Sequence, residues 1–280
     1  MDEEGIDMQG FKDAFVKGNM FASGIAVDYG ASMIIAKSGD SETQGDGTDV
    51  LGKSELRVVS RQELAGEVKV GMRMPSFKVL NQADARPWHF QELLKSNGRW
   101  RLVVFAGNVK DESQKSKIGA LGKKLGGEKS FLKRFTPASK RYDSVIEVLT
   151  VHSAPRQETT IFDFEPVFRP WDDSDGWDYW KIHVDDRSYH EGHGEAYKNY
   201  GVDPQKGCAL ILRPDQYVSW VGEVDDYEAM DNFFSGFMIE QPQSTTTEKI
   251  VPVINGEVAN IKLSNNVKAG NEAVAGIRGQ

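Results

Sequence analysis

The chain has 280 residues with 42 acidic and 34 basic side chains, and its formal net charge of −8 argues against nucleic acid or an anionic membrane as its partner. The only cysteine, Cys208, excludes an internal disulfide framework and suits a reducing compartment. No apolar run approaches the roughly 20 residues that span a bilayer, and the N-terminus is acidic where a signal peptide would be basic, so we expect a cytoplasmic protein.

The first segment, residues 1–37, opens with a predicted helix from Asp7 to Met20. Phe11 and Phe15 share one apolar side of this helix. A single amphipathic helix has no partner against which to bury such a side, so we do not expect a domain here. Residues 38–53 are rich in Gly, Ser, Thr and Asp, and this composition predicts a flexible linker.

Residues 54–240 show the element order of one α/β domain. Leu102 to Ala106 is apolar on both faces, as expected of a central strand covered by helices. Tyr179 to Val184 predicts a further strand, and Glu195 to Tyr200 predicts a short helix that Gly201 ends.

The end of this region predicts a hairpin and a helix. Cys208 to Leu212 and Tyr217 to Val221 are β-rich runs, joined by a four-residue connection that contains Pro214 and Asp215. A last helix is expected from Asp225 to Phe237. Strand, helix, hairpin and helix in this order form the closing half of a thioredoxin-like domain.

Four stretches carry a more specific resemblance. They are SFKVLNQADARPWH (76–89), DSVIEVLTVHSAPR (143–156), GWDYWKIHVDDRSYHEGHGEAYKNYGVD (176–203) and RPDQYVSWVGE (213–223). In this order they closely resemble the C-terminal thioredoxin-like dimerisation domain of phenol 2-monooxygenase (phenol hydroxylase) and related FAD-dependent aromatic hydroxylases. The resemblance implies an α/β fold of the thioredoxin-like, peroxiredoxin-like kind, with a central mixed sheet flanked by helices and a short helical segment before it.

The resemblance also implies how the chain is organised. Residues 1–37 would be the remnant of the segment that leads out of the hydroxylase domains, and residues 54–240 would be the dimerisation domain. The full-length family uses FAD, with NADPH as reductant. The expected partners are a second copy of this chain or flavin-binding hydroxylase domains, with no nucleic acid and no membrane.

No flavin-binding turn can be found in this chain. A Gly-x-Gly-x-x-Gly turn should follow a buried strand and open a helix, whereas the glycine groups here follow loops or charged stretches. We therefore expect no cofactor bound to this chain, and no family catalytic residue can be placed on it.

A thiol redox site and a metal site are the two other chemistries to consider. A thioredoxin-like redox site would need cysteines after the first long strand, but the sequence there is FAGNVKDES, and Cys208 instead begins a hairpin strand, where we expect a core residue. The best metal candidates by composition are His183, Asp185, Asp186, His190, Glu191 and His193. Their spacing fits no standard motif. We expect His183 on a strand face, and His190 and His193 in a turn that they fix by hydrogen bonding.

Aromatic residues provide the candidate interface. Trp171, Trp177, Tyr179 and Trp180 lie within ten residues of one another in a loop-rich region. Such a group forms either a satellite core or an interface anchor, since large aromatic side chains bury much area. The resemblance to a dimerisation domain favours an interface.

Two neighbouring regions have opposite charge. Residues 110–141 carry ten basic and three acidic side chains, whereas residues 163–195 carry ten acidic and three basic ones. These charges could pair within the fold, pair across a subunit boundary, or form solvated faces.

The tail, residues 241–280, departs from the family pattern. It contains VPVINGEVANIKL, in which Asn255 and Gly256 sit between alternating apolar runs and predict a hairpin.

These observations favour a C-terminal fragment, or a stand-alone relative, of a flavin-dependent aromatic hydroxylase whose own task is structural. Two alternatives stay open at this point. The chain could supply its domain in trans to a separate flavin subunit, or it could be an independent enzyme with a cryptic metal or thiol site.

Overall fold

The computed structural model describes residues 8–22, 26–37 and 58–242. The predicted linker at 38–53 and the predicted hairpin in the tail lie outside these residues. Within the described ranges, no helix combines the length and the apolar character needed to cross a membrane.

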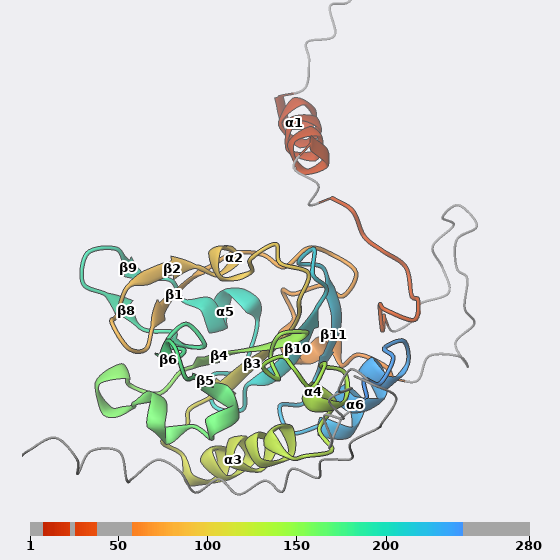
Figure 1. Ribbon diagram of the computed structural model, residues 1–280. Helices are drawn as coiled ribbons and strands as arrows, with labels where there is room; N and C mark the ends of the chain where they lie inside the picture. Colours follow the sequence, from red (N-terminus) through yellow and green to blue (C-terminus); the bar gives the residue numbers. More distant parts are fainter. Residues whose placement is uncertain (1–7, 23–25, 38–57, 243–280) are drawn as a thin grey trace, which may run out of the picture. The chain divides into compact units, whose positions relative to one another are not determined.

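A seven-stranded mixed sheet forms the centre of the domain (Figure 1). Its strands, in spatial order, are β11 (Val218–Gly222), β10 (Cys208–Leu212), β3 (Trp100–Gly107), β4 (Ile146–His152), β7 (Ile182–Val184), β1 (Lys78–Asn81) and β2 (Pro87–His89). The three central strands, β3, β4 and β7, run parallel, and the outer pairs are antiparallel. The apolar run at 102–106 is therefore the middle of a central strand, as predicted.

Helices cover both faces of this sheet (Figure 1). On one face lie α3 (Glu112–Gly126), α4 (Phe131–Arg134) and α6 (Tyr227–Ser235), together with the 3₁₀ turns η3 (Ile161–Asp163) and η4 (Pro166–Phe168). On the other face lie η1 (Gln62–Ala65), α2 (Phe90–Leu93) and α5 (Ala196–Tyr200). A further turn, η2 (Arg156–Glu158), follows β4. Each face of the sheet thus has its own apolar core, which is why β3, β4 and β10 carry apolar side chains on both of their faces.

The two cores differ in their large side chains. Phe131, Phe168 and Trp220 are fully buried on the face of α3, whereas Phe90 and Tyr200 are fully buried on the face of α5. Burying a side chain of this size removes much apolar surface from water, so these residues supply a large part of the driving force for folding.

Most predicted elements are confirmed, with one difference in length. The hairpin β10–β11, the short helix α5 and the last helix α6 lie where the sequence places them. Gly201 adopts a φ of +68° and ends α5, in a conformation that favours glycine. The strand predicted from Tyr179 to Val184 is shorter, because only Ile182–Val184 pairs in the sheet. Asp178 accepts a hydrogen bond from the backbone N–H of Trp180, so the residues before Ile182 form a turn.

Two small hairpins extend from the sheet. One consists of β5 (Trp171–Asp172) and β6 (Gly176–Trp177), and the other of β8 (Arg187–Ser188) and β9 (Gly192–His193). The first helix, α1 (Met8–Ala22), confirms the predicted amphipathic helix, and Phe11 stacks on Phe15 along its exposed apolar side.

The architecture is thioredoxin-like in its peroxiredoxin-like form. Parallel β3 and β4, the antiparallel β10–β11 hairpin beside them, and helices on both faces confirm the fold class expected from the sequence.

Candidate functional site: an acidic aromatic cleft

The β5–β6 hairpin brings two of the candidate interface residues together. Trp171 and Trp177 are register partners, and their rings meet edge to face with centroids 4.9 Å apart. Asp172 stabilises the connecting turn by accepting a hydrogen bond of 2.9 Å from the backbone N–H of Ser174. Gly176 has a φ of +76°, which an L side chain would adopt only with strain.

The four candidate aromatic residues divide into two kinds. The exposed fractions of Trp171, Tyr179 and Trp180 are 52%, 47% and 48%. Trp177 is half-buried and packs against the core on the α3 face, with the Arg169 guanidinium 4.5 Å from the centroid of its ring. Trp177 therefore supports the surface, whereas the other three present apolar area to solvent.

Trp180 packs against the edge strand β2. Its ring lies edge to face against Trp88 of β2, with centroids 5.1 Å apart, and Arg86 lies 4.3 Å from the Trp88 ring centroid. This part of the surface thus combines the β5–β6 segment with the edge strand of the sheet.

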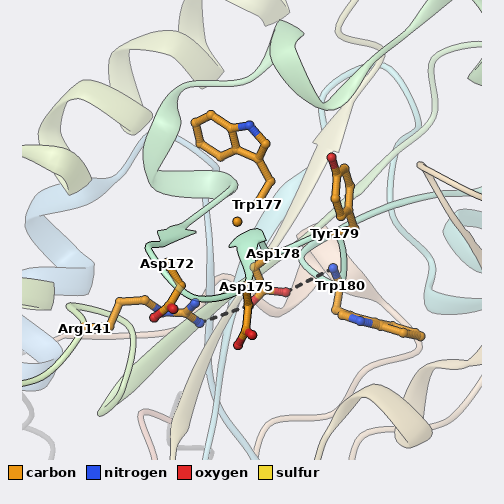
Figure 2. A pocket seen from close by; sticks show the side chains of 8 residues that line it. Arg141, Asp172, Asp175, Trp177, Asp178, Tyr179 and Trp180 are labelled. Carbon is orange, nitrogen blue, oxygen red and sulfur yellow. Dashed lines mark hydrogen bonds and ion pairs between the residues drawn. The ribbon is translucent and has the colours of Figure 1, made fainter. Parts of the chain in front are cut away.

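A cleft of about 400 Å³ opens among these residues, and we call it the acidic aromatic cleft (Figure 2). Its lining consists of Arg141, Asp172, Asp175, Gly176, Trp177, Asp178, Tyr179 and Trp180. Three carboxylates thus face one guanidinium. Figure 2 shows these side chains around the cleft, with dashed lines for the contacts of Asp178 with Arg141 and with the backbone N–H of Trp180.

The single cation of the cleft is already engaged. Arg141 binds Asp143 with two hydrogen bonds, of 2.5 and 2.8 Å, and reaches Asp178 at 3.0 Å. Burial by itself would lower the pKa of Arg141, but these carboxylates outweigh it and raise the pKa. No salt bridge in the described part of the chain includes Asp172 or Asp175.

A buried ionic cluster lies behind the cleft. Arg101 of β3 and Glu147 of β4 are register partners in the parallel pair and form a 3.2 Å salt bridge. Lys181 binds Glu147 and lies 3.4 Å from Asp143 and 3.5 Å from Asp178. Burial by itself would raise the pKa of Asp143, but Arg141, followed by the charge of Lys181, outweighs it and lowers the pKa.

Two buried histidines lie farther along the same parallel strands. His152 ends β4, and its Nε2 is 2.8 Å from Oε1 of Gln82. His183 lies fully buried in β7, as expected for a residue on a strand face. Burial lowers the pKa of His152 to about 4 and the pKa of His183 to about 3, so both imidazoles are neutral at pH 7.

Two of the metal candidates come together in the fold, because His193 Nδ1 lies 3.4 Å from Oδ1 of Asp185. Asp185 accepts hydrogen bonds from the backbone N–H groups of Ala196 and Tyr197 at the start of α5. Glu191 binds Lys78 at 2.6 Å. Within the described ranges, no three His, Cys, Asp or Glu side chains gather as metal ligands would.

The two histidines of the β8–β9 hairpin behave differently from each other. His193 Nδ1 accepts a 2.8 Å hydrogen bond from the N–H of Glu195, so this histidine does fix a turn. His190 instead lies edge to face against Tyr189, with ring centroids 4.7 Å apart.

The thiol is part of the core. Cys208 is fully buried at the start of β10, and burial raises its pKa well above the usual range of a thiol. At the start of α3, where a thioredoxin-like fold would carry its reactive thiol, Asp111 instead caps the helix by accepting from the N–H of Gln114. The expectation of a structural Cys208 is confirmed.

Sequence reasoning found the aromatic residues but missed Arg141 and the ionic cluster. The signals were present, because Arg101 and Glu147 each interrupt an apolar strand run, where an ion is rarely placed without a partner. Which residues neutralise them depends on the register of β3 and β4, and spacing along the chain does not reveal this register.

Comparison with known proteins gives a consistent result. The family described as "Phenol hydroxylase, C-terminal dimerisation domain" matches residues 27–242. A phenol 2-monooxygenase of Aspergillus fumigatus, fsqG, is 32% identical over 231 residues, which are 82% of this chain and 34% of that protein. The FAD-dependent monooxygenase terD of Aspergillus terreus is 34% identical over 84% of this chain and 35% of its own length.

More distant similarities extend the comparison. A 3-hydroxybenzoate 4-monooxygenase of Comamonas testosteroni is 28% identical over 84% of this chain and 33% of that protein. The chain thus spans about a third of the length of these relatives. Among solved structures, a peroxiredoxin-like protein from Aquifex aeolicus aligns over 62% of this chain and 91% of its own, with 11% identity and a TM-score of 0.39.

Proposed function

Because the chain belongs to the phenol hydroxylase C-terminal dimerisation domain family, we propose that it is the self-association module of an FAD-dependent aromatic hydroxylase. The observation that carries this proposal is the family match, which covers almost the whole described domain. The module forms a homodimer, and hydroxylation depends on the flavin and substrate domains of the full-length family rather than on residues of this chain.

The exposed aromatic residues Trp171, Tyr179 and Trp180 form the anchor of this dimer. Tyr179 and Trp180 line the cleft, and Trp171 is exposed on the neighbouring hairpin. Such residues dominate interface energies because each buries much area at a low cost in side-chain entropy. Trp177 holds the hairpin on the core beneath them.

Sedimentation velocity across a concentration series tests the proposal. Trp180→Ala removes a surface anchor, so the dissociation constant of the dimer should rise roughly thirtyfold, which corresponds to about 2 kcal/mol. The circular dichroism spectrum should stay unchanged. Tyr189→Ala is the matched control, because Tyr189 is an exposed aromatic residue on the other hairpin.

A third variant separates the interface from the core. Trp177→Ala should reduce both association and thermal stability, because its ring packs against the core on the α3 face. A wild-type chain that stays monomeric at high concentration would contradict the proposed function.

A further inference from the structure

The two oppositely charged segments stay almost unpaired within one subunit. Among the salt bridges of the described residues, only Arg141 with Asp178 joins the basic segment 110–141 to the acidic segment 163–195. Pairing within the fold therefore accounts for one contact. Some of the other charges pair elsewhere, as Arg134 does with Asp231 and Glu191 does with Lys78.

The basic charges gather on the outer side of α3. We call Lys115, Lys117, Lys123 and Lys124 the α3 lysines; all four are exposed and belong to no salt bridge within the described ranges. They point outward because Ile118, Leu121 and Leu125 occupy the buried side of the same helix. Lys115, Lys117 and Lys123 are thus exposed cations without a salt bridge among the described residues, whereas Lys124 lies 5.7 Å from the centroid of the Tyr227 ring.

The acidic aromatic cleft has the complementary character. Asp143 and Asp178 engage its guanidinium, and the charge of Arg141 also acts on Asp172. Asp175 belongs to no salt bridge among the described residues. Tyr179 and Trp180 add aromatic rings, whose faces attract ammonium groups. A lysine side chain therefore fits the cleft through both its charge and its apolar stem.

The two surfaces lie on the same side of the sheet. α3 packs closely on η4, since a Cβ added at Gly122 would come within 2.6 Å of Glu165 and 2.8 Å of Phe168. β5 begins three residues after η4 ends. In a dimer with twofold symmetry, a contact between two such neighbouring surfaces is made twice, once in each direction.

We propose that the acidic aromatic cleft of one subunit receives the α3 lysines of a second copy of the chain, in a contact made twice across a twofold axis. This inference rests on the proposed self-association and specifies its surface. Exposed ion pairs each contribute little to affinity, so they fix the orientation of the dimer while the aromatic side chains supply most of its affinity.

Charge reversal tests the pairing. Asp175→Lys reverses the charge of one side chain in the cleft, and Lys117→Glu with Lys123→Glu reverses the charges of two of the α3 lysines. None of these side chains makes a hydrogen bond or salt bridge in the described structure, so each variant should fold normally. Each reversed protein alone should dimerise at least about tenfold more weakly, because like charges then face each other in both contacts.

Mixing the two reversed proteins provides the decisive measurement. In the mixed dimer both contacts again join opposite charges, so its dissociation constant should return to within about threefold of the wild-type value. Wild-type association should also weaken as salt rises from 0.1 to 1 M, because the screening length falls from about 10 to about 3 Å.

The control carries the same change in net charge elsewhere. Lys69→Glu with Lys95→Glu alters two exposed lysines beside the core on the opposite face of the sheet and should leave association unchanged. A dimer that tolerates the reversals, a mixture that does not recover, or a control that weakens equally would each overturn this inference while the proposed function stands. A monomeric wild type would instead overturn the proposed function.

Discussion

Arg101 and Glu147 carry opposite charges into a buried sheet. They lie opposite each other in the parallel pair β3–β4, and Lys181 reaches the same carboxylate from the residue before β7. Replacing one member of such a cluster by a neutral group leaves the others charged and buried, which costs more than an exposed ion pair contributes.

We expect Glu147→Gln to lower the free energy of unfolding by about 3 kcal/mol, because Arg101 and Lys181 would keep their charges without a carboxylate between them. Urea unfolding followed by circular dichroism measures this loss. Glu63→Gln removes an exposed carboxylate from a surface pair with Arg61 and should leave the free energy of unfolding almost unchanged. Equal losses in the two variants would show that burial of the cluster is unimportant.

The buried histidines make stability depend on pH. The pKa of His152 is lowered to about 4 and that of His183 to about 3, whereas an imidazole of the unfolded chain has a pKa of about 6.5. The unfolded state therefore binds protons first as the pH falls. The stabilisation that the neutral rings provide is complete above pH 6.5 and is lost as the pH falls toward 4.

Below pH 6.5, each buried histidine should lower the free energy of unfolding by about 1.4 kcal/mol for every unit by which the pH falls. Urea unfolding between pH 7.5 and 5 measures the slope. His183→Leu removes one titrating ring, so its slope should be about half that of the wild type. His190→Gln changes an exposed ring and serves as the control. A His183→Leu slope identical to that of the wild type would refute this assignment.

At the scale of elements, the contact between α3 and η4 depends on a single glycine. Gly122 is buried, and an added Cβ would lie 2.6 Å from Cβ of Glu165 and 2.8 Å from the Phe168 ring. Since Phe168 is fully buried, neither the helix nor the turn can move apart without loss of packing.

Gly122→Ala should therefore destabilise the domain by about 1 to 3 kcal/mol, although alanine favours the helix more than glycine does. Gly126→Ala is the matched control at the end of the same helix, where the nearest atom to the added Cβ is 3.8 Å away. That variant should keep or raise stability by up to about 1 kcal/mol. Thermal unfolding of both variants measures the two changes in stability. A Gly122→Ala variant more stable than the wild type would show that the contact between α3 and η4 leaves room for a methyl group.

At the scale of the whole molecule, the chain corresponds to one part of its relatives. It covers about a third of the length of its relatives, and that third is the dimerisation domain. Its sequence contains no Gly-x-Gly-x-x-Gly turn between a strand and a helix, the feature that holds the pyrophosphate of a dinucleotide.

The purified chain should therefore be colourless and should retain no FAD, because its residues offer no pyrophosphate-binding turn. Absorption spectroscopy after incubation with FAD and gel filtration makes the measurement, and bovine serum albumin treated in parallel corrects for carry-over. A yellow protein with one FAD per chain would mean that flavin binding needs fewer parts than the family pattern indicates.

Local sequence signals predict most elements of the domain, and the family resemblance predicts its fold. The apolar run at 102–106, the turn at Pro214 and Asp215 and the stop at Gly201 are local signals, because backbone preference and side-chain periodicity act over a few residues. The same reading placed the aromatic candidates close together and Cys208 in the core. It extended the strand before Ile182 too far, since the pairing that limits β7 comes from β4 and β1.

Which charged side chains pair with each other depends on the folded structure. Arg101 binds Glu147, which lies 46 positions later in the sequence. Arg141 binds Asp143 two positions later and Asp178 37 positions later. The same packing leaves Asp175, Lys115, Lys117 and Lys123 without a salt bridge among the described residues. Coulomb energy depends on distance and burial in the folded molecule, and spacing along the chain specifies neither.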